Sequence, residues 1–332
     1  MDTLLLLTIL VVIFALAFDF INGFHDTANA IATSVSTRAL KPRTAVLMAA
    51  TMNFIGALTF TGVAQTISKD IVDPFMLENG SLVILAALLS AIAWNLITWY
   101  FGIPSSSSHA LIGSIAGAAI SAAGFGILNY KGFIKILEAL IFSPFIALFV
   151  GFIVMSIFKV VLKNRNLFKA NKRIRYMQIG TAALQAFTHG TNDAQKSMGI
   201  ITMALIAGGL QTTDDVQLWV RIAAATAMGL GTSIGGYKII KTVGTKIMKI
   251  RPVNGAAADL SSAGIIFSAT LLHLPVSTTH VISSAIMGVG TAQRVRDVNW
   301  GVAKNIVMTW IITLPISAAL AAILYQVLAL FF

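Results

Sequence analysis

The amino-acid sequence predicts an all-α, polytopic membrane protein of about 10–12 transmembrane helices, built as two inverted-topology repeats with discontinuous helices at the midplane. Its composition, the length of its apolar runs and an internal repetition lead to this prediction. The 332 residues are 57% hydrophobic and only 11% charged, with a mean hydropathy of +0.86. A soluble domain carries about 25% charged residues. The chain therefore belongs in a lipid bilayer.

The net charge of +11 does not indicate nucleic acid as a partner, because the basic residues cluster in loops between apolar runs. The absence of cysteine excludes disulfides, thiolate metal sites and cysteine nucleophiles. The N-terminus begins Met1-Asp2 without the basic region and small-residue cleavage site of a signal peptide. We therefore expect the first apolar run to be a retained membrane span.

The apolar runs are long enough to cross the membrane, since about 20 helical residues span the ~30 Å hydrocarbon core. Eight are largely uninterrupted: 4–21, 44–66, 82–101, 109–128, 134–158, 218–235, 255–272 and 305–332. Two more, 177–209 and 275–292, contain polar residues. The stretches 4–37 and 177–209 each carry a polar cluster in the middle, which predicts that both are discontinuous helices.

Loop charge predicts the orientation. The segment 159–176, KVVLKNRNLFKANKRIRY, is strongly basic and is expected to be a cytoplasmic linker, with a first repeat at 1–158 and a second at 177–332. Acidic loops at Asp70–Glu78 and Asp214–Asp215 are expected outside. This scheme puts both termini outside and gives five crossings before the linker. The odd number means that the second half enters the membrane inverted.

Two motifs recur in the same order, which supports the repeat. FINGFHDTANA (20–30) aligns with FTHGTNDAQKS (187–197), an offset of 167 residues. IPSSSSHALIGSIAG (103–117) aligns with LPVSTTHVISSAIMG (274–288), an offset of 171 residues. Inverted repeats that meet near the midplane are a transporter architecture.

The first motif places Asp26 and its counterpart Asp193 inside apolar runs, where a carboxylate must be paired, protonated or bound to a cation. Amide oxygens and backbone carbonyls beside them are hard donors that suit Na+, Mg2+ or Ca2+ rather than soft metals. We expect the cation ligands to be Asp26, Asn22, Asn29, Asp193 and Asn192. A structural carboxylate satisfied by helix amides is the alternative.

The second motif is a proline followed by hydroxyl residues and an apolar run, which predicts a helix start. The free N–H groups and partial positive charge of such an end suit an anion like phosphate. The expected phosphate ligands are Ser106, Ser107, Ser108, Ser277, Thr278 and Thr279, with Lys196 as a further cationic group. Ordinary helix capping is the alternative.

The charges require anion and cations to bind together. Phosphate at about −2 beside two aspartates brings the site to about −4. Two helix ends supply roughly +1, Lys196 one more, and about two monovalent cations complete the balance. His109 and His280 are expected to orient the hydroxyl loops, and the GxxxG spacings Gly113/Gly117 and Gly231/Gly235 to allow close helix packing.

At these motifs, and at the segment GGYKIIKTVG (235–244), the sequence resembles the PiT family of inorganic phosphate transporters over essentially its whole length. The resemblance implies transport of phosphate with Na+ or H+, in a compact form without a central cytoplasmic domain, and a possible homodimer. The signature aspartates of the family match Asp26 and Asp193, whereas His25, Gln195 and Lys196 depart from its usual pattern. Asn53 stands where some relatives carry glutamate, and Asp259 is its second-half counterpart.

Together these inferences predict a symporter of inorganic phosphate in the cytoplasmic membrane, with Na+ favoured and H+ possible as the coupling ion and with no other cofactor. Transport of sulfate or another oxyanion is the main alternative, because hydroxyl and amide donors discriminate poorly by charge. A channel and an intramembrane phosphohydrolase that uses His and Asp are the others. We expect a transporter and not an enzyme.

Overall fold

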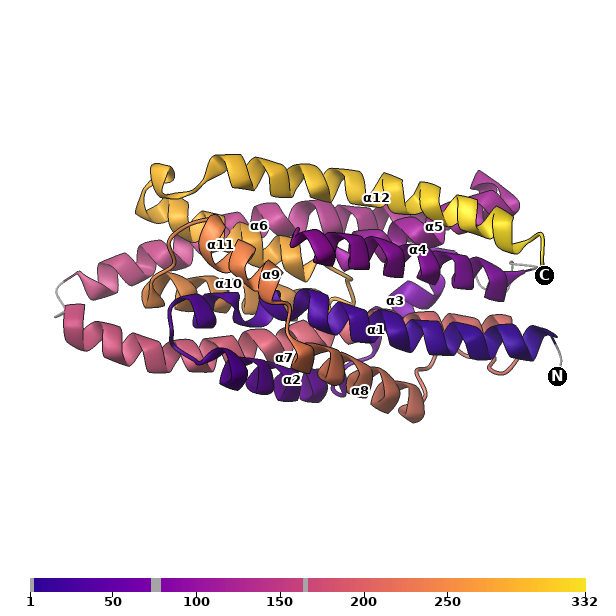
Figure 1. Cartoon of the computed structure of the whole chain (residues 1–332), viewed down its shortest axis with the longest axis horizontal. Helices are drawn as coiled ribbons and strands as arrows, with labels where there is room; N and C mark the ends of the chain where they lie inside the picture. The colour runs from indigo at the N-terminus through magenta and orange to yellow at the C-terminus, as the bar shows by residue number, and fades with distance from the viewer. Residues whose placement is uncertain (1–2, 73–78, 164–166) are drawn as a thin grey trace.

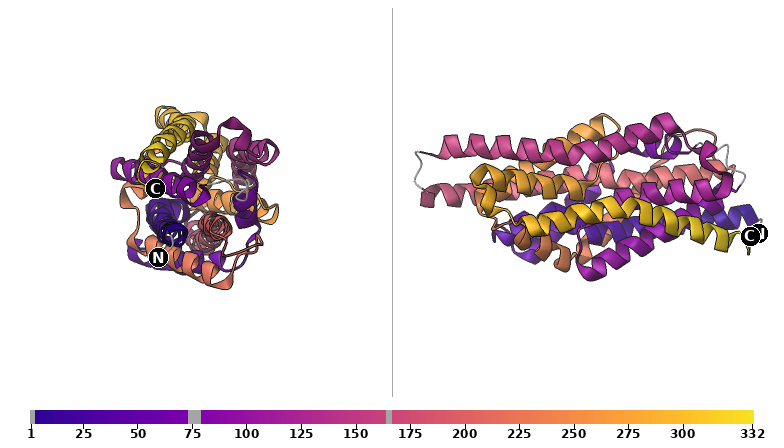
Figure 2. Two further views of the ribbon diagram at one scale, coloured as in Figure 1. Left: turned by 90° about the vertical axis from the view of Figure 1, so that its right-hand side faces the viewer. Right: turned by 90° about the horizontal axis from the view of Figure 1, so that it is seen from above.

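The computed structural model describes residues 3–72, 79–163 and 167–332 and is all-helical in these ranges. The helices are α1 (Thr3–Ser36), α2 (Pro42–Ala57), α3 (Gly62–Lys69), α4 (Gly80–Phe101), α5 (Ser107–Ala123), α6 (Tyr130–Leu162), α7 (Leu167–Ala207), α8 (Leu218–Ile234), α9 (Tyr237–Lys241), α10 (Pro252–Leu271), α11 (Thr278–Gln293) and α12 (Trp300–Leu328). They form an elongated bundle in which the long helices run along its length (Figures 1 and 2).

Four described helices, α1, α4, α6 and α12, are individually long and apolar enough to cross a membrane. Helices α2 and α3 add a fifth span if they are counted together, with a 70° bend between them. Large apolar side chains such as Phe145 and Ile311 are exposed on α6 and α12, where lipid would cover them. The predicted polytopic class is confirmed.

The prediction that the stretches 4–37 and 177–209 are discontinuous is wrong, because α1 and α7 run without a break through their polar clusters. Polar side chains in the middle of a helix do not disturb its backbone hydrogen bonds when neighbouring helices supply their partners. The chain instead breaks between α4 and α5 and between α10 and α11.

These two breaks have the same construction. Helix α4 ends at Gly102 (φ 66°) and α10 ends near His273 (φ 59°), both left-handed. The amide of Ile103 then donates to Thr98 O (2.9 Å), and that of Leu274 donates to Ala269 O (2.8 Å). A proline follows in each case and cannot continue a helix. The breaks lie 171 residues apart, as the sequence offset predicts.

The contacts made by the helices of the first repeat recur for the equivalent helices of the second. Helix α5 packs on α12 and α11 packs on α6, while α1 packs on α8 and α7 packs on α2. Close approach depends on glycine: a Cβ on Gly117 would collide with the backbone of Ala318, and one on Gly288 would collide with that of Leu148. The predicted packing role of Gly113, Gly117 and Gly231 is therefore confirmed, whereas Gly235 (φ 76°) ends α8.

The first described helix begins, and the last ends, at the same end of the bundle (Figure 1). At the opposite end α6 ends and α7 begins, and a pocket there brings Lys159, Lys249, Arg251 and Arg294 together. The segment 159–176 is partly helical, with its first residues in α6 and residues 167–176 in α7, while 164–166 lie outside the described residues. The repeat limits at 1–158 and 177–332 stay a prediction.

Two hydrophobic cores flank a polar layer. One contains Val11 and Phe18 of α1, and the other contains Ala28 and Ile31 of the same helix. The intervening segment from Asn22 to Thr27 is entirely buried. The polar motif of α1 therefore lies between the cores, halfway along the bundle.

We predict that Gly117→Ala lowers the free energy of unfolding by about 1–3 kcal/mol, because the new methyl group overpacks the α5–α12 contact. Gly264→Ala is the matched control, since a Cβ at this exposed helical glycine has no neighbour within 4 Å. Thermal unfolding of both detergent-purified variants measures the difference. Equal melting temperatures for the two variants would show that the close approach is not a constraint.

Candidate functional site

The two signature aspartates meet in the polar layer. Asp26 on α1, and Asp193 and His189 on α7, are all buried, and each offers a possible ligand atom within 4.8 Å of the others. Residues that are 167 positions apart in the chain thus share one site, as the repeat predicts. This is the only such carboxylate and histidine group in the described residues.

Each aspartate accepts a hydrogen bond from a hydroxyl group of its own repeat, at the start of the helix that follows the break. Ser107, in the first turn of α5, donates to Asp26 Oδ2 (3.2 Å). Thr278, its counterpart in α11, donates to Asp193 Oδ2 (3.1 Å). A third hydrogen bond joins the two repeats, because the Thr279 hydroxyl donates to Asp26 Oδ1 (3.4 Å). Both motifs of both repeats therefore converge on one point.

The hydroxyl loops are helix starts, as predicted. Ser106 caps α5 by accepting from the amide of His109 (3.1 Å), and Ser277 caps α11 by accepting from the amide of His280 (3.3 Å). Two helix N-termini, with first-turn amides that have no intrahelical acceptor, thus point into the same buried region. Such ends favour an anion.

The hydroxyl groups of the six predicted phosphate ligands have different hydrogen-bond partners. Ser107, Thr278 and Thr279 face the aspartates, whereas Ser106 and Ser277 act as caps. Ser108 donates to Val276 O (2.8 Å) and ties the two loops together. Capping therefore uses Ser106 and Ser277 and leaves the other hydroxyl residues of the same motif for other contacts.

The predicted amide ligands of the cation also differ in their hydrogen bonding. Asn29 donates to Thr278 and Thr279 (3.3 and 2.8 Å), and its carbonyl oxygen Oδ1 is buried without a partner in the described chain. Asn22 is buried, and neither atom of its side-chain amide has a hydrogen-bond partner among the described residues. Asn192 instead closes the α10–α11 break, since it donates to Leu274 O (3.1 Å) and accepts from the amide of Val276 (3.3 Å).

Lys196 is fully buried and its ammonium pairs with Asp193 Oδ1. His189 Nε2 lies 3.2 Å from Asp193 Oδ2. Within the described residues Asp26 has no lysine or arginine paired with it: His25 Nδ1 donates to its Oδ1 (2.6 Å), and its other partners are hydroxyls. The two aspartates thus occupy unequal electrostatic environments.

Comparison with known proteins identifies the family. The sequence profile of the phosphate transporter family matches residues 22–174 and again 163–321. The chain belongs to this family. The double match, one in each half, agrees with the repeat read from the sequence, and membership confirms the predicted resemblance and the transporter rather than the enzyme class.

Relatives extend over the whole chain. A probable low-affinity inorganic phosphate transporter of Bacillus subtilis is 72% identical over 333 residues, covering all of both chains. A protein of the same description from Rhizobium meliloti is 45% identical and covers 98% of both chains. A solved structure titled the sodium-dependent phosphate transporter matches with a TM-score of 0.88 and 28% identity, over 98% of this chain and 100% of the other.

Sequence reasoning missed several members of the site. His25 links Asp26 to Thr98 (Nε2 to Oγ1, 3.1 Å), and Ser105 donates to Thr98 (2.8 Å). His189 Nδ1 lies 3.1 Å from Asn53 Oδ1. The histidines stand within the signature motifs, so their position was a signal. Of their partners, Asn53 was noted only as the position where some relatives carry glutamate, and Thr98 lies in another apolar run and carried no signal.

The rings of His109 and His280 contact each other at a tilt of 36° with centroids 4.5 Å apart, and His280 stacks on Trp310 at 3.9 Å. The indole of Trp310 donates to Pro104 O (3.3 Å). These aromatic contacts join the two hydroxyl loops to α12. The predicted role of both histidines, to orient the loops, fits this arrangement.

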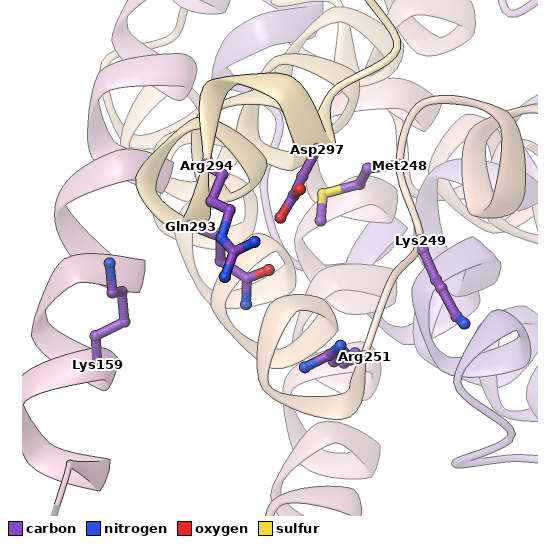
Figure 3. Close-up of a pocket in the computed structure, with 7 residues that line it drawn as sticks. All are labelled: Lys159, Met248, Lys249, Arg251, Gln293, Arg294 and Asp297. Carbon is purple, nitrogen blue, oxygen red and sulfur yellow. The ribbon is translucent and has the colours of Figure 1, made fainter.

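A separate pocket of about 560 Å³ opens at the basic end of the bundle (Figure 3). Its lining includes four cationic side chains and one carboxylate, with Lys159 donating to Ala292 O (3.0 Å). The residues are Lys159, Met248, Lys249, Arg251, Gln293, Arg294 and Asp297. The excess of positive charge makes this end attractive to anions.

We predict that Lys196→Met destabilises the protein by about 3–5 kcal/mol, because it leaves Asp193 buried without its cation. The double variant Asp193→Asn/Lys196→Met removes both charges and should recover most of that loss. Thermal unfolding in detergent measures both variants. If the double variant is as unstable as the single one, the ion pair is not what stabilises Lys196 in the core.

Proposed function

We propose that this chain is a Na+-coupled symporter of inorganic phosphate in the cytoplasmic membrane. The observation that carries the proposal is the paired contact of Ser107 with Asp26 and of Thr278 with Asp193. It brings two carboxylates, which suit cations, against two helix N-termini, which suit an anion. Family membership and the sodium-dependent relative of known structure support the same ions.

The shared hydroxyls give a physical route to coupling. Without a cation, the O–H groups of Ser107, Thr278 and Thr279 are directed to the aspartates. A Na+ ion on a carboxylate repels the hydroxyl proton and draws the hydroxyl oxygen toward itself. The proton can then be donated to a phosphate oxygen at the helix ends. Cation and anion thus strengthen each other's binding, and neither is well held alone.

Two predicted cation ligands fit this proposal directly, since Asn22 and Asn29 have unpartnered amide oxygens on the same face of α1 as Asp26. Asn192 supports the site indirectly, by holding the α10–α11 break in shape. Lys196 balances charge through Asp193. We also propose, from the family resemblance alone, that the protein is a homodimer.

The orientation is the remaining part of the proposal. Four basic side chains lie at the end of the bundle opposite to the start of α1 and the end of α12. They are Lys159, Lys249, Arg251 and Arg294. Basic loops favour the cytoplasm. We therefore place that end and the 159–176 segment inside, and both chain termini outside.

We predict that purified protein in proteoliposomes takes up labelled phosphate when an inward Na+ gradient is imposed, and that Asp26→Asn lowers the rate by about 10²-fold or more, because the variant removes the charge that holds the cation. Asp214→Asn is the matched control, an exposed acid paired with Lys69 at 2.6 Å. It should transport at the unmodified rate.

Three comparisons make this experiment decisive. A proton gradient alone should drive little uptake if Na+ is the coupling ion. Excess sulfate should compete weakly, whereas strong competition would favour a general oxyanion carrier. Uptake by Asp26→Asn at the unmodified rate would refute the role of the aspartate.

The orientation has its own test, because the chain contains no cysteine. We predict that Ala329→Cys reacts with a membrane-impermeant maleimide in intact cells, whereas Lys163→Cys reacts only after permeabilisation, since the two residues end helices at opposite ends of the bundle. The opposite labelling pattern would invert the proposed topology.

A further inference from the structure

Helix α1 carries a second buried carboxylate that the central site does not use. Asp19 is fully buried, and neither of its oxygens accepts a hydrogen bond of normal geometry within the described residues. Buried polar groups in proteins nearly always have a partner, and a buried charge needs one most. An unpartnered buried carboxylate therefore points to a ligand that the polypeptide does not supply.

Two further polar side chains beside Asp19 are also buried without a hydrogen-bond partner of normal geometry in the described chain. Asn22 follows one turn later on α1, and both atoms of its side-chain amide are buried without a partner. Ser197 of α7 lies next to the Asp19 carboxylate as a weak hydrogen-bond donor, and its buried hydroxyl has no other partner in the described chain. Apolar Phe18 and Met198 adjoin this group in the sequence and are buried as well.

This group is distinct in position from the central site. Asp19 precedes Asp26 by seven residues, which is about 10 Å along a helix at ~1.5 Å per residue. It lies toward the end of the bundle where α1 begins, which the proposed orientation places outside. Asn22 stands between the two carboxylates, on the same side of the helix as both.

The symmetry-related position, where the two repeats exchange roles, has no copy of this group. The position equivalent to Asp19 is Ala186, and the position equivalent to Ser197 is Ala30. The inner side of the site therefore lacks this carboxylate and hydroxyl. A feature that occurs once, without a copy at the symmetry-related position, is not explained by the general construction of the fold.

We propose that Asp19, the Asn22 carbonyl oxygen and the Ser197 hydroxyl form a site for a monovalent cation, Na+, on the outer side of the central site. Its donors are hard oxygens with a single carboxylate, a charge that suits Na+ better than Ca2+ or Mg2+. The ammonium of Lys196, a charged neighbour of Asp19 together with Asp193, further disfavours a divalent ion.

The proposed site rests on the proposed Na+ coupling and adds a step to it. A cation that enters from outside meets Asp19 before Asp26, and Asn22 can serve both carboxylates in turn. The outer site raises the local concentration of Na+ at the central one. It is needed for efficient use of Na+ rather than for contact with phosphate.

The transport test compares Asp19→Asn and Ser197→Ala with the Asp214→Asn control in proteoliposomes. Asp19→Asn should raise the half-saturating Na+ concentration for phosphate uptake by about tenfold or more, and Ser197→Ala should raise it severalfold. At saturating Na+, the KM for phosphate should stay unchanged in both. An unaltered Na+ dependence in Asp19→Asn overturns the proposal, as does a shift in the pH dependence without a shift in the Na+ dependence.

A binding test separates this site from the proposed function. Na+ that binds the folded state raises the melting temperature of the detergent-purified protein, with no gradient or transport required. In Asp26→Asn, some stabilisation by Na+ over choline should remain, and it should disappear in Asp19→Asn/Asp26→Asn. If it persists in the double variant, Asp19 is not a ligand. If unmodified protein shows no Na+-driven uptake but this pattern holds, the coupling proposal fails and the cation site stands.

Discussion

The burial of Asp26 against Asp193 is the constraint around which the rest of the structure is arranged. Two unit charges at 4.8 Å repel each other by about 3.5 kcal/mol at an effective dielectric constant of 20, before any cost of desolvation. A single neutral hydrogen bond contributes only about 1 kcal/mol. The site therefore needs several donors and an internal cation, and it has them in Lys196, His25 and three hydroxyls.

Continuous and broken helices divide this work. The unbroken α1 and α7 hold the carboxylates rigidly, because every backbone group around them stays in the helical ladder. The breaks before α5 and α11 turn two helix N-termini toward those carboxylates. Because the second repeat is inverted, the carboxylate and the helix N-terminus of each repeat meet those of the other repeat at the same depth, near the middle of the bundle.

The sequence predicted the parts of this arrangement that depend on local chemistry. Pro104 and Pro275 must interrupt a helix, and the hydroxyl residues after them are good caps, so α5 and α11 began where expected. The error on α1 and α7 arose because a polar cluster was taken as a break in the backbone, although both helices keep their backbone hydrogen bonds through it. Pairings such as His25 with Thr98, or Asn192 with Val276, join distant segments and could not be predicted from spacing alone.

The departures from two-fold symmetry carry a further consequence. Position 29 is asparagine and its counterpart 196 is lysine, so Asp193 has a buried ammonium beside it, whereas Asp26 accepts from His25 and from hydroxyls. A Na+ ion gains more at an unneutralised carboxylate than at one already paired with an ammonium group. We therefore expect Asp26 to be the stronger cation ligand of the two, even though the repeats supply both with equivalent hydroxyls. An inverted repeat makes the two sides of the membrane alike in geometry, and it is the unequal charge of residues such as Lys196 and Asp19 that makes them different in energy.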